Sequence, residues 1–559
     1  MVRILDEPGT RTSEPLLIGS LLRTPLATAP RQQIVYRDVA RYDYLTLRVR
    51  IAKLARVLTE LGIEEGDTVA VMDWDSHRYL ECYFAIPMMG AVLMTVNLRL
   101  SADQIAYTLQ RANARVVLVH HDFVPLLTAL AAQLPLVTHA VLLEPEADDV
   151  CPFRSQRLDY EALLMAADAD FVFREFDERA VATTFFTTGT TGLPKAVCFT
   201  HRQIMIHTLA VLGALASPQH GQSFRQGDVY MPMTPMFHVH AWGLPYVATL
   251  LGVKQVYPGR YVPARLLALR EREGVSYSHC VPTILQMLLE APESAQTDLR
   301  GWKITVGGAA LGQSLARAAL ARGIDVFAAY GMSETCPFLT AARLTDDDGH
   351  DEDANEIAQR CRTGLPAPLV ELRIVDENMQ DVPHDGEAMG ELVARAPWLT
   401  SGYVGDRDAT VELWHGGYLH TRDIATIDSQ GVVQLRDRLK DVIKSGGEWV
   451  SSLLLEDLIG RHENVAEVAV IGVADERWGE RPVAVVVRRT AAANHIDADA
   501  LRQHLEAFVQ TGQIPKYAVP ERFDFVNAIV KTSVGKFDKK KLRAMLESSG
   551  PVLRSGDDF

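Results

Sequence analysis

Hydrophobic residues in the first half of the chain follow two patterns. In some segments they recur every three or four residues, and in others they form short continuous runs. The first pattern predicts a helix whose apolar face is formed by Leu47, Ile51, Leu54, Leu58 and Leu61. Gly62 follows as the expected C-cap, and Ser101 with Gln104 has the spacing of a capping box. The runs Thr68–Met72 and Val116–Val119 read as buried strands. This alternation predicts parallel sheets covered by helices.

The same alternation continues through residues 220–300. Leu250–Tyr257 and Val275–Cys280 are strand-like and are expected to form strands. Between them, Pro263–Glu273 has helical spacing. The first 430 residues are therefore expected to form one large α/β region.

The pattern changes near the densely charged stretch Arg436–Asp441. Shorter elements follow, with helices expected over 451–461 and 498–510 and strands over 465–473 and 482–488. They suit a compact α+β domain of about 120 residues. The charged stretch is then a candidate hinge, and a solvated surface turn is the alternative. The basic cluster Lys539, Lys540 and Lys541 is expected to be a solvated helix face.

Composition excludes several classes of protein. Among 559 residues, 48% are hydrophobic, which is an ordinary globular value, and the net charge of −15 disfavours an unspecific nucleic-acid binder. The six cysteines form no C-x-x-C motif, so reduced thiols are expected, with neither a zinc site nor a disulfide framework. No apolar run reaches the ~18 residues of a membrane span, and the first residues lack a signal-peptide core. We therefore expect a cytoplasmic protein.

A loop rich in threonine and glycine carries the strongest chemical signal. It follows the apolar run Val181–Phe186 and consists of Thr187, Thr188, Gly189, Thr190, Thr191 and Gly192, with Lys195 close behind. Glycines permit close backbone approach to a ligand, while hydroxyls, N–H groups and the lysine charge suit a polyphosphate. The spacing is not that of a Walker loop. A flexible polar linker is the alternative.

Three further segments place polar side chains after apolar stretches. Tyr330–Thr335 follows the run Ile324–Ala329, so Glu334 could hold a divalent metal and Thr335 a phosphate oxygen. An ordinary strand end capped by its own Ser and Thr explains the segment equally well. Asp423 could bind a vicinal diol, with Arg438 fifteen residues on, or simply end a turn. Lys536, behind Gly535, could be delivered to an anion.

Together these segments resemble the acyl-adenylate-forming enzymes, which include acyl-CoA synthetases, luciferases and the adenylation domains of peptide synthetases. The resemblance spans about residues 20–545. Six motifs appear in the family's order: Thr187–Lys195, Tyr330–Thr335, Tyr418–Asp423, Arg438–Lys440, Ser445–Trp449 and Gly535-Lys536. Fatty acyl-CoA ligases are the most similar branch, on the residues 235–243 and 444–452. A peptide-synthetase aspartate is missing from Phe237–Trp242, and no insertion typical of acyl-AMP ligases lies between Asp423 and Ser445.

The resemblance implies an α/β fold with a large N-terminal domain of helix-covered sheets, a small β-barrel-like part and a small mobile α+β C-terminal domain. The implied boundaries are 1–437, a hinge at 438–443 pivoting near Lys440, and 444–559. It also implies ATP, Mg²⁺ and coenzyme A. The expected substrate is a carboxylic acid, above all a medium- or long-chain fatty acid. It would react with ATP to form acyl-AMP and then with coenzyme A to form a thioester. By analogy with related ligases, we also expect the chain to form a homodimer.

The resemblance also implies roles for individual residues. The catalytic set is Lys536, Glu334 and His238, and the metal would be held by Glu334 and Thr188. His238, Trp242 and Gly243 would face the acid, with Trp242 as an aromatic gate, although a structural His238 is the alternative. Tyr330 would stack on adenine, and Asp423 and Arg438 would fix the ribose. The remaining nucleotide and CoA contacts are assigned to Thr187–Gly192, Lys195, Gly307, Gly308, Ala309, Gly331, Met332, Ser333, Thr335, Lys440, Gly446, Gly447, Glu448 and Trp449.

Two positions depart from the family pattern. Ala196 replaces a glycine common after the loop lysine, and we expect tolerance unless its φ is positive. Val530 replaces a proline common before the last lysine motif, which puts regulation of Lys536 by acetylation in doubt. Two other functions stay open: the same adenylation on an aromatic, short or sulfur-containing acid or with another acceptor, and a catalytically dead nucleotide-binding protein.

Overall fold

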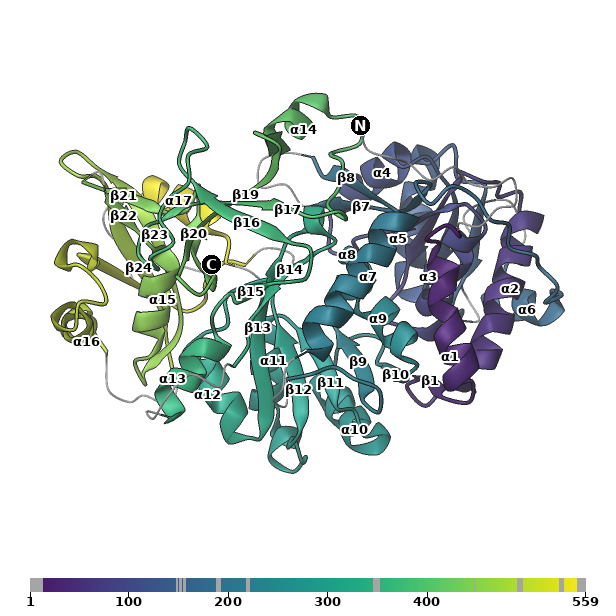
Figure 1. Ribbon diagram of the computed structural model, residues 1–559, viewed down its shortest axis with the longest axis horizontal. Helices are drawn as coiled ribbons and strands as arrows, with labels where there is room; N and C mark the ends of the chain where they lie inside the picture. Colours follow the sequence, from purple (N-terminus) through teal and green to yellow (C-terminus); the bar gives the residue numbers. More distant parts are fainter. Residues whose placement is uncertain are drawn as a thin grey trace, which may run out of the picture.

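The computed structural model describes residues 14–146, 149, 153, 157–187, 193–217, 222–344, 352–446, 448–489, 496–531 and 537–549. Four β-sheets organise this part of the chain (Figure 1). Among the helices of the described residues, none is long and apolar enough to cross a membrane.

The first sheet has nine strands in the order β15-β14-β13-β12-β11-β9-β10-β1-β2. Its central strands from β13 to β1 are parallel, and β2, β14 and β15 are antiparallel at the edges. The strands are β1 (Gln33–Tyr36), β2 (Ala40–Asp43), β9 (Val229–Met233), β10 (Lys254–Tyr257), β11 (Tyr277–Cys280), β12 (Trp302–Val306), β13 (Ile324–Gly331), β14 (Phe338–Ala341) and β15 (Leu365–Pro366). Strand β1 therefore joins the sheet by pairing with β10, far along the chain.

The second sheet has six strands in the order β6-β5-β3-β4-β7-β8. All are parallel except β8, which runs antiparallel to β7. The strands are β3 (Thr68–Met72), β4 (Val92–Thr95), β5 (Ala114–Val119), β6 (His139–Leu142), β7 (Val181–Thr187) and β8 (Lys195–Thr200). The threonine-glycine loop thus connects β7 to β8 at the carboxyl end of β7.

Helices cover both sheets and join them. One buried cluster combines residues of both sheets with α2, α3 and α7, while separate clusters lie under the outer helices of each sheet. The helices are α1 (Arg23–Thr28), α2 (Tyr44–Glu60), α3 (His77–Met88), α4 (Ala102–Arg111), α5 (Val124–Leu130), α6 (Tyr160–Ala166), α7 (His201–Ala216), α8 (Val239–Trp242), α9 (Leu244–Leu251), α10 (Pro263–Glu273), α11 (Pro282–Glu290), α12 (Gln313–Ala321) and α13 (Glu352–Arg360).

Most elements expected from the pattern are present. For the strand expected over Leu250–Tyr257, the predicted first residue is wrong. Leu47, Ile51, Leu54 and Leu58 line the buried face of α2, Gly62 has φ +83°, and Ser101 forms a capping box with Gln104. The strand expected over Leu250–Tyr257 begins only at Lys254. Leu250 and Leu251 end α9, and Gly252 in the left-handed region separates that helix from β10. A short apolar stretch such as Leu250-Leu251 does not distinguish a buried helix end from a strand.

A third, antiparallel sheet corresponds to the small β-barrel-like part. It lies between the first two sheets and the C-terminal region in Figure 1. Its strands are β16 (Glu371–Val375), β17 (Gly390–Arg395), β18 (Trp414–His415), β19 (Tyr418–Ile427) and β20 (Val433–Arg438), with α14 (Arg407–Leu413) before β18. It packs around its own buried cluster of apolar residues.

The C-terminal region is an α+β unit around the fourth sheet, as expected. Its strands are β21 (Ile443–Ser445), β22 (Glu448–Val450), β23 (Val465–Asp475), β24 (Gly479–Arg488) and β25 (Arg522–Val526), and its helices are α15 (Ser452–Gly460), α16 (Ala498–Gln510) and α17 (Lys539–Ser549). Apolar residues fill both faces of this sheet, which gives the region two hydrophobic clusters of its own.

The expectation that the basic cluster is wholly solvated is wrong for Lys539. Its side chain is 10% exposed and its Nζ lies 2.7 Å from Glu456 Oε1, on α15. Nζ also donates to Ser452 Oγ at 2.5 Å. Lys540 and Lys541 are exposed, as expected. Lys539 therefore joins α17 to α15, which its place in a run of three lysines does not indicate.

Asp437, near the end of β20, joins the large region to the small one. Its Oδ2 accepts the backbone N–H of Ser452 at 2.6 Å, and its Oδ1 accepts that of Arg438 at 2.8 Å. The hydroxyl of Ser451 donates to the backbone oxygen of Arg436. The charged stretch at 436–441 is therefore bonded to the start of α15.

Candidate functional site

The site-forming loops follow strands at the carboxyl edge of the first sheet. After β9 the chain continues to β10 on one side, and after β11 it continues to β12 on the other side. This reversal creates a crevice where open α/β sheets bind ligands. His238 and Trp242 follow β9, Gly307 and Gly308 follow β12, and Tyr330 ends β13.

The segment before His238 is held by side chains from β4, from the loop after β3 and from α3. Asp75 Oδ1 accepts the backbone N–H of Met236 at 2.8 Å, and Thr95 donates to the backbone oxygen of Phe237 at 2.9 Å. Tyr83 donates to the backbone oxygen of Met236 at 2.5 Å. These bonds fix a half-buried His238 between the two sheets.

Residues Val239–Gly243 form an unusual left-handed turn. Their φ values are 48°, 55°, 47°, 59° and 74°. Such values are strained for a β-branched residue such as Val239, and strain of this kind persists only where the surrounding structure imposes it. At Gly243 an added Cβ would lie 2.8 Å from Cε1 of the buried His207, so a side chain is excluded there. The turn directs Trp242 toward the strand ends.

The indole of Trp242 packs against the glycines that follow β12. A Cβ on Gly307 would lie 3.1 Å from Trp242 Cη2 and 2.9 Å from the backbone oxygen of Ala329. Gly308 has φ +76°, and its Cβ would lie 3.2 Å from Val281 Cγ1. Ala309 is exposed beyond them. The absence of side chains at the two glycines therefore lets the Trp242 indole pack against this wall.

Tyr330, Asp423 and Arg438 come together from three strands. Asp423 on β19 and Arg438 on β20 are directly opposite each other, with Nε and Oδ1 3.4 Å apart. The Tyr330 hydroxyl donates to Asp423 Oδ2 at 2.6 Å. Burial and the neighbouring carboxylate raise the pKa of Tyr330, which keeps it a hydrogen-bond donor. The structure thus unites three of the residues selected from the sequence.

Glu334 and Lys195 meet at a residue that the sequence did not reveal, Tyr403. The Tyr403 hydroxyl donates to Glu334 Oε1 at 2.6 Å, and Lys195 Nζ lies 4.8 Å from the centre of its ring. Burial raises the pKa of Glu334, while the Tyr403 bond and the charges of Arg438 and Lys195 oppose that rise. Tyr403 reaches the site because Val197 on β8 pairs with it in an isolated bridge.

The loop containing Glu334 is bonded internally. Thr335 is buried, and its hydroxyl contacts the backbone oxygens of Met332 and Pro337. A Cβ on Gly331 would overlap the backbone oxygen of Pro337. The indole N–H of Trp398 donates to the backbone oxygen of Thr335 at 2.9 Å. Ser333 and Met332 are partly exposed on the same loop.

Several residues from the sequence lie elsewhere or outside the described residues. The β21–β22 hairpin, with Gly446, Glu448 and Trp449, is in the C-terminal region, well away from β7 and β8 in Figure 1, and Lys440 is exposed just before it. Ala196 is in β8 opposite Phe186, without a positive φ, so its methyl group is tolerated as expected. The positions outside the described residues are Thr188, Gly189, Thr190, Thr191, Gly192, Gly447 and Lys536.

Comparisons with known proteins add an independent finding. Residues 22–404 match the AMP-binding enzyme family, and residues 454–536 match the AMP-binding enzyme C-terminal domain. The chain is 39% identical over 543 residues to a long-chain-fatty-acid–CoA ligase of Thermus thermophilus, covering 96% of each chain. It is 35% identical to a 3-methylmercaptopropionyl-CoA ligase of Ruegeria lacuscaerulensis, covering 96% of this chain and 98% of the relative. The crystal structure of the anthranilate CoA ligase AuaEII in complex with anthranoyl-AMP shares the fold, with a TM-score of 0.82 and 22% identity over 95% of this chain and 98% of that one.

Proposed function

The chain belongs to the AMP-binding enzyme family, and from this we propose that it is an ATP-dependent acyl-CoA ligase. In the first step, a carboxylate oxygen attacks the α-phosphate of ATP, giving acyl-AMP and pyrophosphate. In the second step, the thiol of coenzyme A attacks the acyl carbon, and AMP leaves as the thioester forms. Both reactants of the first step are anions, so the site must neutralise negative charge.

The observation that carries this proposal is the meeting of Lys195, Glu334 and Tyr403 beside the β7–β8 connection. One cation, one buried carboxylate and one hydroxyl meet at the start of β8, which directly follows in sequence the loop expected to hold the polyphosphate. Lys195 also lies 3.8 Å from Asp406 Oδ2, which keeps its ammonium near the start of β8. This arrangement suits retention of the pyrophosphate leaving group.

The donor set also fits Mg²⁺, a hard cation that prefers oxygen ligands. Glu334 supplies a buried carboxylate, and Thr188 would supply a hydroxyl from the threonine loop. When bound, the ion would neutralise charge on the phosphates. Tyr403 fixes the orientation of the Glu334 carboxylate from the other side.

We assign the nucleoside to the Tyr330–Asp423–Arg438 group. Asp423 would accept hydrogen bonds from the two ribose hydroxyls, and Arg438 would hold that carboxylate in place through its ion pair at 3.4 Å. The Tyr330 ring would stack on adenine, with Gly307, Gly308 and Ala309 as the opposite wall. The hydroxyl of Tyr330 already points to Asp423, so its ring orientation is set before any nucleotide binds.

A medium- or long-chain fatty acid is the substrate we favour. The residues from Phe237 to Trp242 contain no carboxylate that could hold an amino group, and the relative from Thermus thermophilus is named for long-chain fatty acids. Trp242 would act as the gate, because its indole fills the space beside Gly307 and its backbone is strained. The Ruegeria relative makes a short sulfur-containing acid the second candidate.

We further infer a division into residues 1–437, a hinge at 438–443 and a mobile domain at 444–559 that delivers Lys536 for the first step. Lys536→Ala should abolish pyrophosphate release from acid plus ATP. It should leave thioester formation from supplied acyl-AMP largely intact. Equal loss of both steps would contradict the role assigned to Lys536.

A pyrophosphate-release screen tests the whole proposal. The panel should contain saturated acids of increasing chain length, 3-methylmercaptopropionate and aromatic acids, each with and without coenzyme A. Thioester formation with the longer acids is the expected result. Turnover restricted to the sulfur-containing or aromatic acids would replace the substrate, and no turnover with any acid would favour a catalytically dead nucleotide-binding protein.

A further inference from the structure

The second sheet has the same reversal of winding as the first. After β3 the chain continues to β4 on one side, and after β5 it continues to β6 on the other side. The carboxyl ends of β3 and β5 are neighbours, because these two parallel strands pair directly. A second crevice of the ligand-binding kind therefore lies at this edge. The proposed adenylation chemistry uses none of the residues in it.

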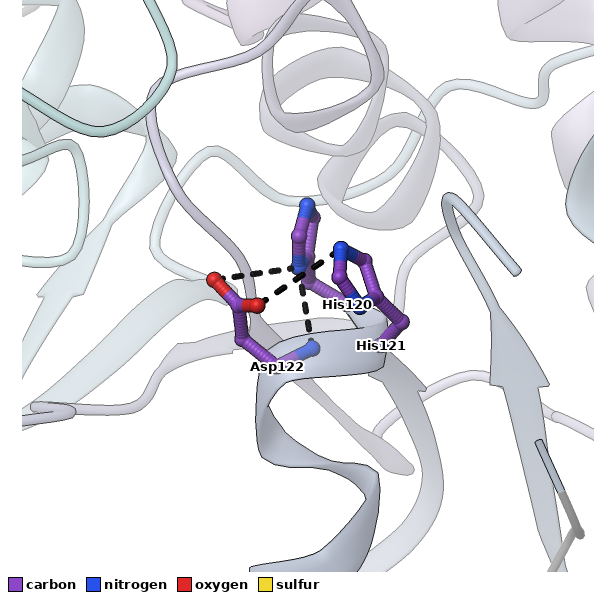
Figure 2. Close-up of side chains that lie close together, drawn as sticks. All are labelled: His120, His121 and Asp122. Carbon is purple, nitrogen blue, oxygen red and sulfur yellow. Dashed lines mark hydrogen bonds and ion pairs between the residues drawn. The ribbon is translucent and has the colours of Figure 1, made fainter. Parts of the chain in front are cut away.

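Two histidines and an aspartate occupy that crevice. His120 directly follows β5, and His121 and Asp122 begin the single 3-10 turn His121–Phe123. One side-chain donor atom from each of the three lies within 4.8 Å of the others. Figure 2 shows the Asp122 carboxylate turned toward both rings, with Oδ2 3.8 Å from His120 Nδ1 and Oδ1 3.5 Å from His121 Nε2.

A second carboxylate lies on the far side of each ring. His120 Nε2 is 3.3 Å from Glu144 Oε2, and His121 Nδ1 is 3.7 Å from Glu146 Oε1. Histidines that bind metals characteristically give their other ring N–H to a carboxylate, which fixes the tautomer and the ring orientation. His120 has that arrangement, and Glu146 lies just beyond hydrogen-bond distance of His121. The ring nitrogens that face Asp122 are the candidate metal ligands.

The aspartate is itself held across the crevice. The indole N–H of Trp74, in the loop after β3, donates to Asp122 Oδ2 at 2.7 Å. The backbone N–H of Asp122 donates a hydrogen bond to His120 Nδ1 at 3.2 Å, and a metal ion bound at Nδ1 would replace this bond. His121 is 27% exposed at its side chain and Asp122 is 35% exposed, so an ion can enter from solvent.

We propose that His120, His121 and Asp122 form a second metal site, for a divalent transition-metal ion such as Zn²⁺. Two imidazole nitrogens and one carboxylate oxygen suit Zn²⁺, Co²⁺ or Ni²⁺ rather than Mg²⁺. Three protein ligands leave one position of a tetrahedral ion open to water. The site is separate from Glu334, which follows β13 of the first sheet.

The test is metal binding by the full, untagged chain after treatment with a chelator. Equilibrium dialysis against micromolar ZnCl₂ in excess Mg²⁺, followed by metal analysis, should find one Zn²⁺ per chain. His121→Ala and Asp122→Ala should each weaken binding roughly tenfold or more, and Glu146→Gln should weaken it by about ten- to a hundredfold at most. Co²⁺ should give the intense visible absorption of a tetrahedral site in the unmodified protein.

A matched control uses another pair of histidines. The rings of His462 and His504 have centres 5.2 Å apart, and His504 Nε2 contacts a backbone oxygen instead of a carboxylate. His462→Ala should leave Zn²⁺ binding unchanged. The proposal is overturned by less than one Zn²⁺ per chain, by equal binding in His121→Ala, or by an octahedral Co²⁺ spectrum. Circular dichroism of each variant shows that it is folded.

Discussion

The hydroxyl of Tyr403 bonds Oε1 of Glu334 at 2.6 Å although the two residues are 69 positions apart. The same ring lies beneath Lys195 Nζ. Tyr403 is thus a positioning residue for both charged groups of the proposed phosphate site. It contacts both Glu334, the proposed metal-binding carboxylate, and Lys195, and no contact to substrate is assigned to it.

Tyr403→Phe should slow the first step. Hydrogen bonds to charged groups contribute about 1.5–3 kcal/mol, so we expect pyrophosphate release to fall roughly ten- to a hundredfold. The Mg²⁺ concentration needed for half-maximal rate should rise, because Glu334 loses its orientation. Tyr517→Phe, at a half-exposed tyrosine of the C-terminal region, is the control. An unchanged Mg²⁺ dependence would show that Tyr403 does not act through Glu334.

Gly307→Ala should impair binding of the acid and the nucleotide. The new methyl group would lie 2.9 Å from the backbone oxygen of Ala329 and 3.1 Å from the Trp242 ring, so the indole must move. We expect KM to rise at least tenfold and the unfolding temperature to fall, because the backbone oxygen of Ala329 cannot move aside as a flexible side chain can. Gly312→Ala is the matched variant, since its Cβ would meet only Asp457 Oδ1, at 3.8 Å. Equal KM values in the two variants would show that close packing at Gly307 is not needed for substrate binding.

Glu456→Gln should destabilise the C-terminal region strongly. The substitution leaves the buried Lys539 without its partner at 2.7 Å, and breaking a buried pair costs about 3–5 kcal/mol. Glu467→Gln breaks the more exposed pair with Lys531, at 2.6 Å, and should cost less than about 1 kcal/mol. Calorimetry of the full chain compares the two. Similar shifts in the melting of this region would contradict the importance of burial.

Acid should destabilise the large region through its buried histidines. Burial lowers the pKa of His201 to about 4, and His201 Nδ1 accepts the backbone N–H of Ile18 at 3.2 Å. The unfolded chain binds this proton near pH 6.5, so the stability is present above that pH and is lost as pH falls below it. At pH 5 the loss from this group is about 2 kcal/mol.

His207, His240 and His279 have pKa values lowered by burial to about 3, so their contributions have the same sign. His201→Gln keeps an acceptor for Ile18 but removes the titration. Urea unfolding at pH 7 and pH 5 should therefore show a smaller loss in the variant, by about 2 kcal/mol. Identical losses in both proteins would assign the acid sensitivity to other groups.

Local signals explain which elements could be predicted from the sequence. The helices Pro263–Glu273 and Ala498–Gln510 have the expected bounds, because Pro263 suits the first turn, Gly274 takes a left-handed φ and Asp497 caps the second helix. Asp423 and Arg438 were selected together from a separation of fifteen residues, which an antiparallel pair of strands bridges easily. In each case the interaction that makes the feature predictable joins residues that are close together in the sequence.

The features that could not be predicted depend on distant partners. Lys539 was placed on a solvated face because its neighbours are lysines, and its partner Glu456 is on another helix. Tyr403 has no distinguishing neighbours, and only the pairing of its segment with β8 brings it to Glu334. The left-handed turn at Val239–Gly243 contradicts the preference of most of its residues, so the surrounding contacts impose it.

The pairing of β1 with β10 also sets an order of events during synthesis. Ile34 of β1 can pair with Gln255 of β10 only after Gln255 has been synthesised. At about 5–20 residues per second, the roughly 220 intervening residues emerge from the ribosome over about 10–40 s. Until then β1 has only β2 as a neighbour, and a lone two-stranded hairpin is marginally stable in water. Strand β1 therefore joins its sheet only after β10 has been synthesised, and a nascent chain stalled before residue 254 would expose it to chaperones.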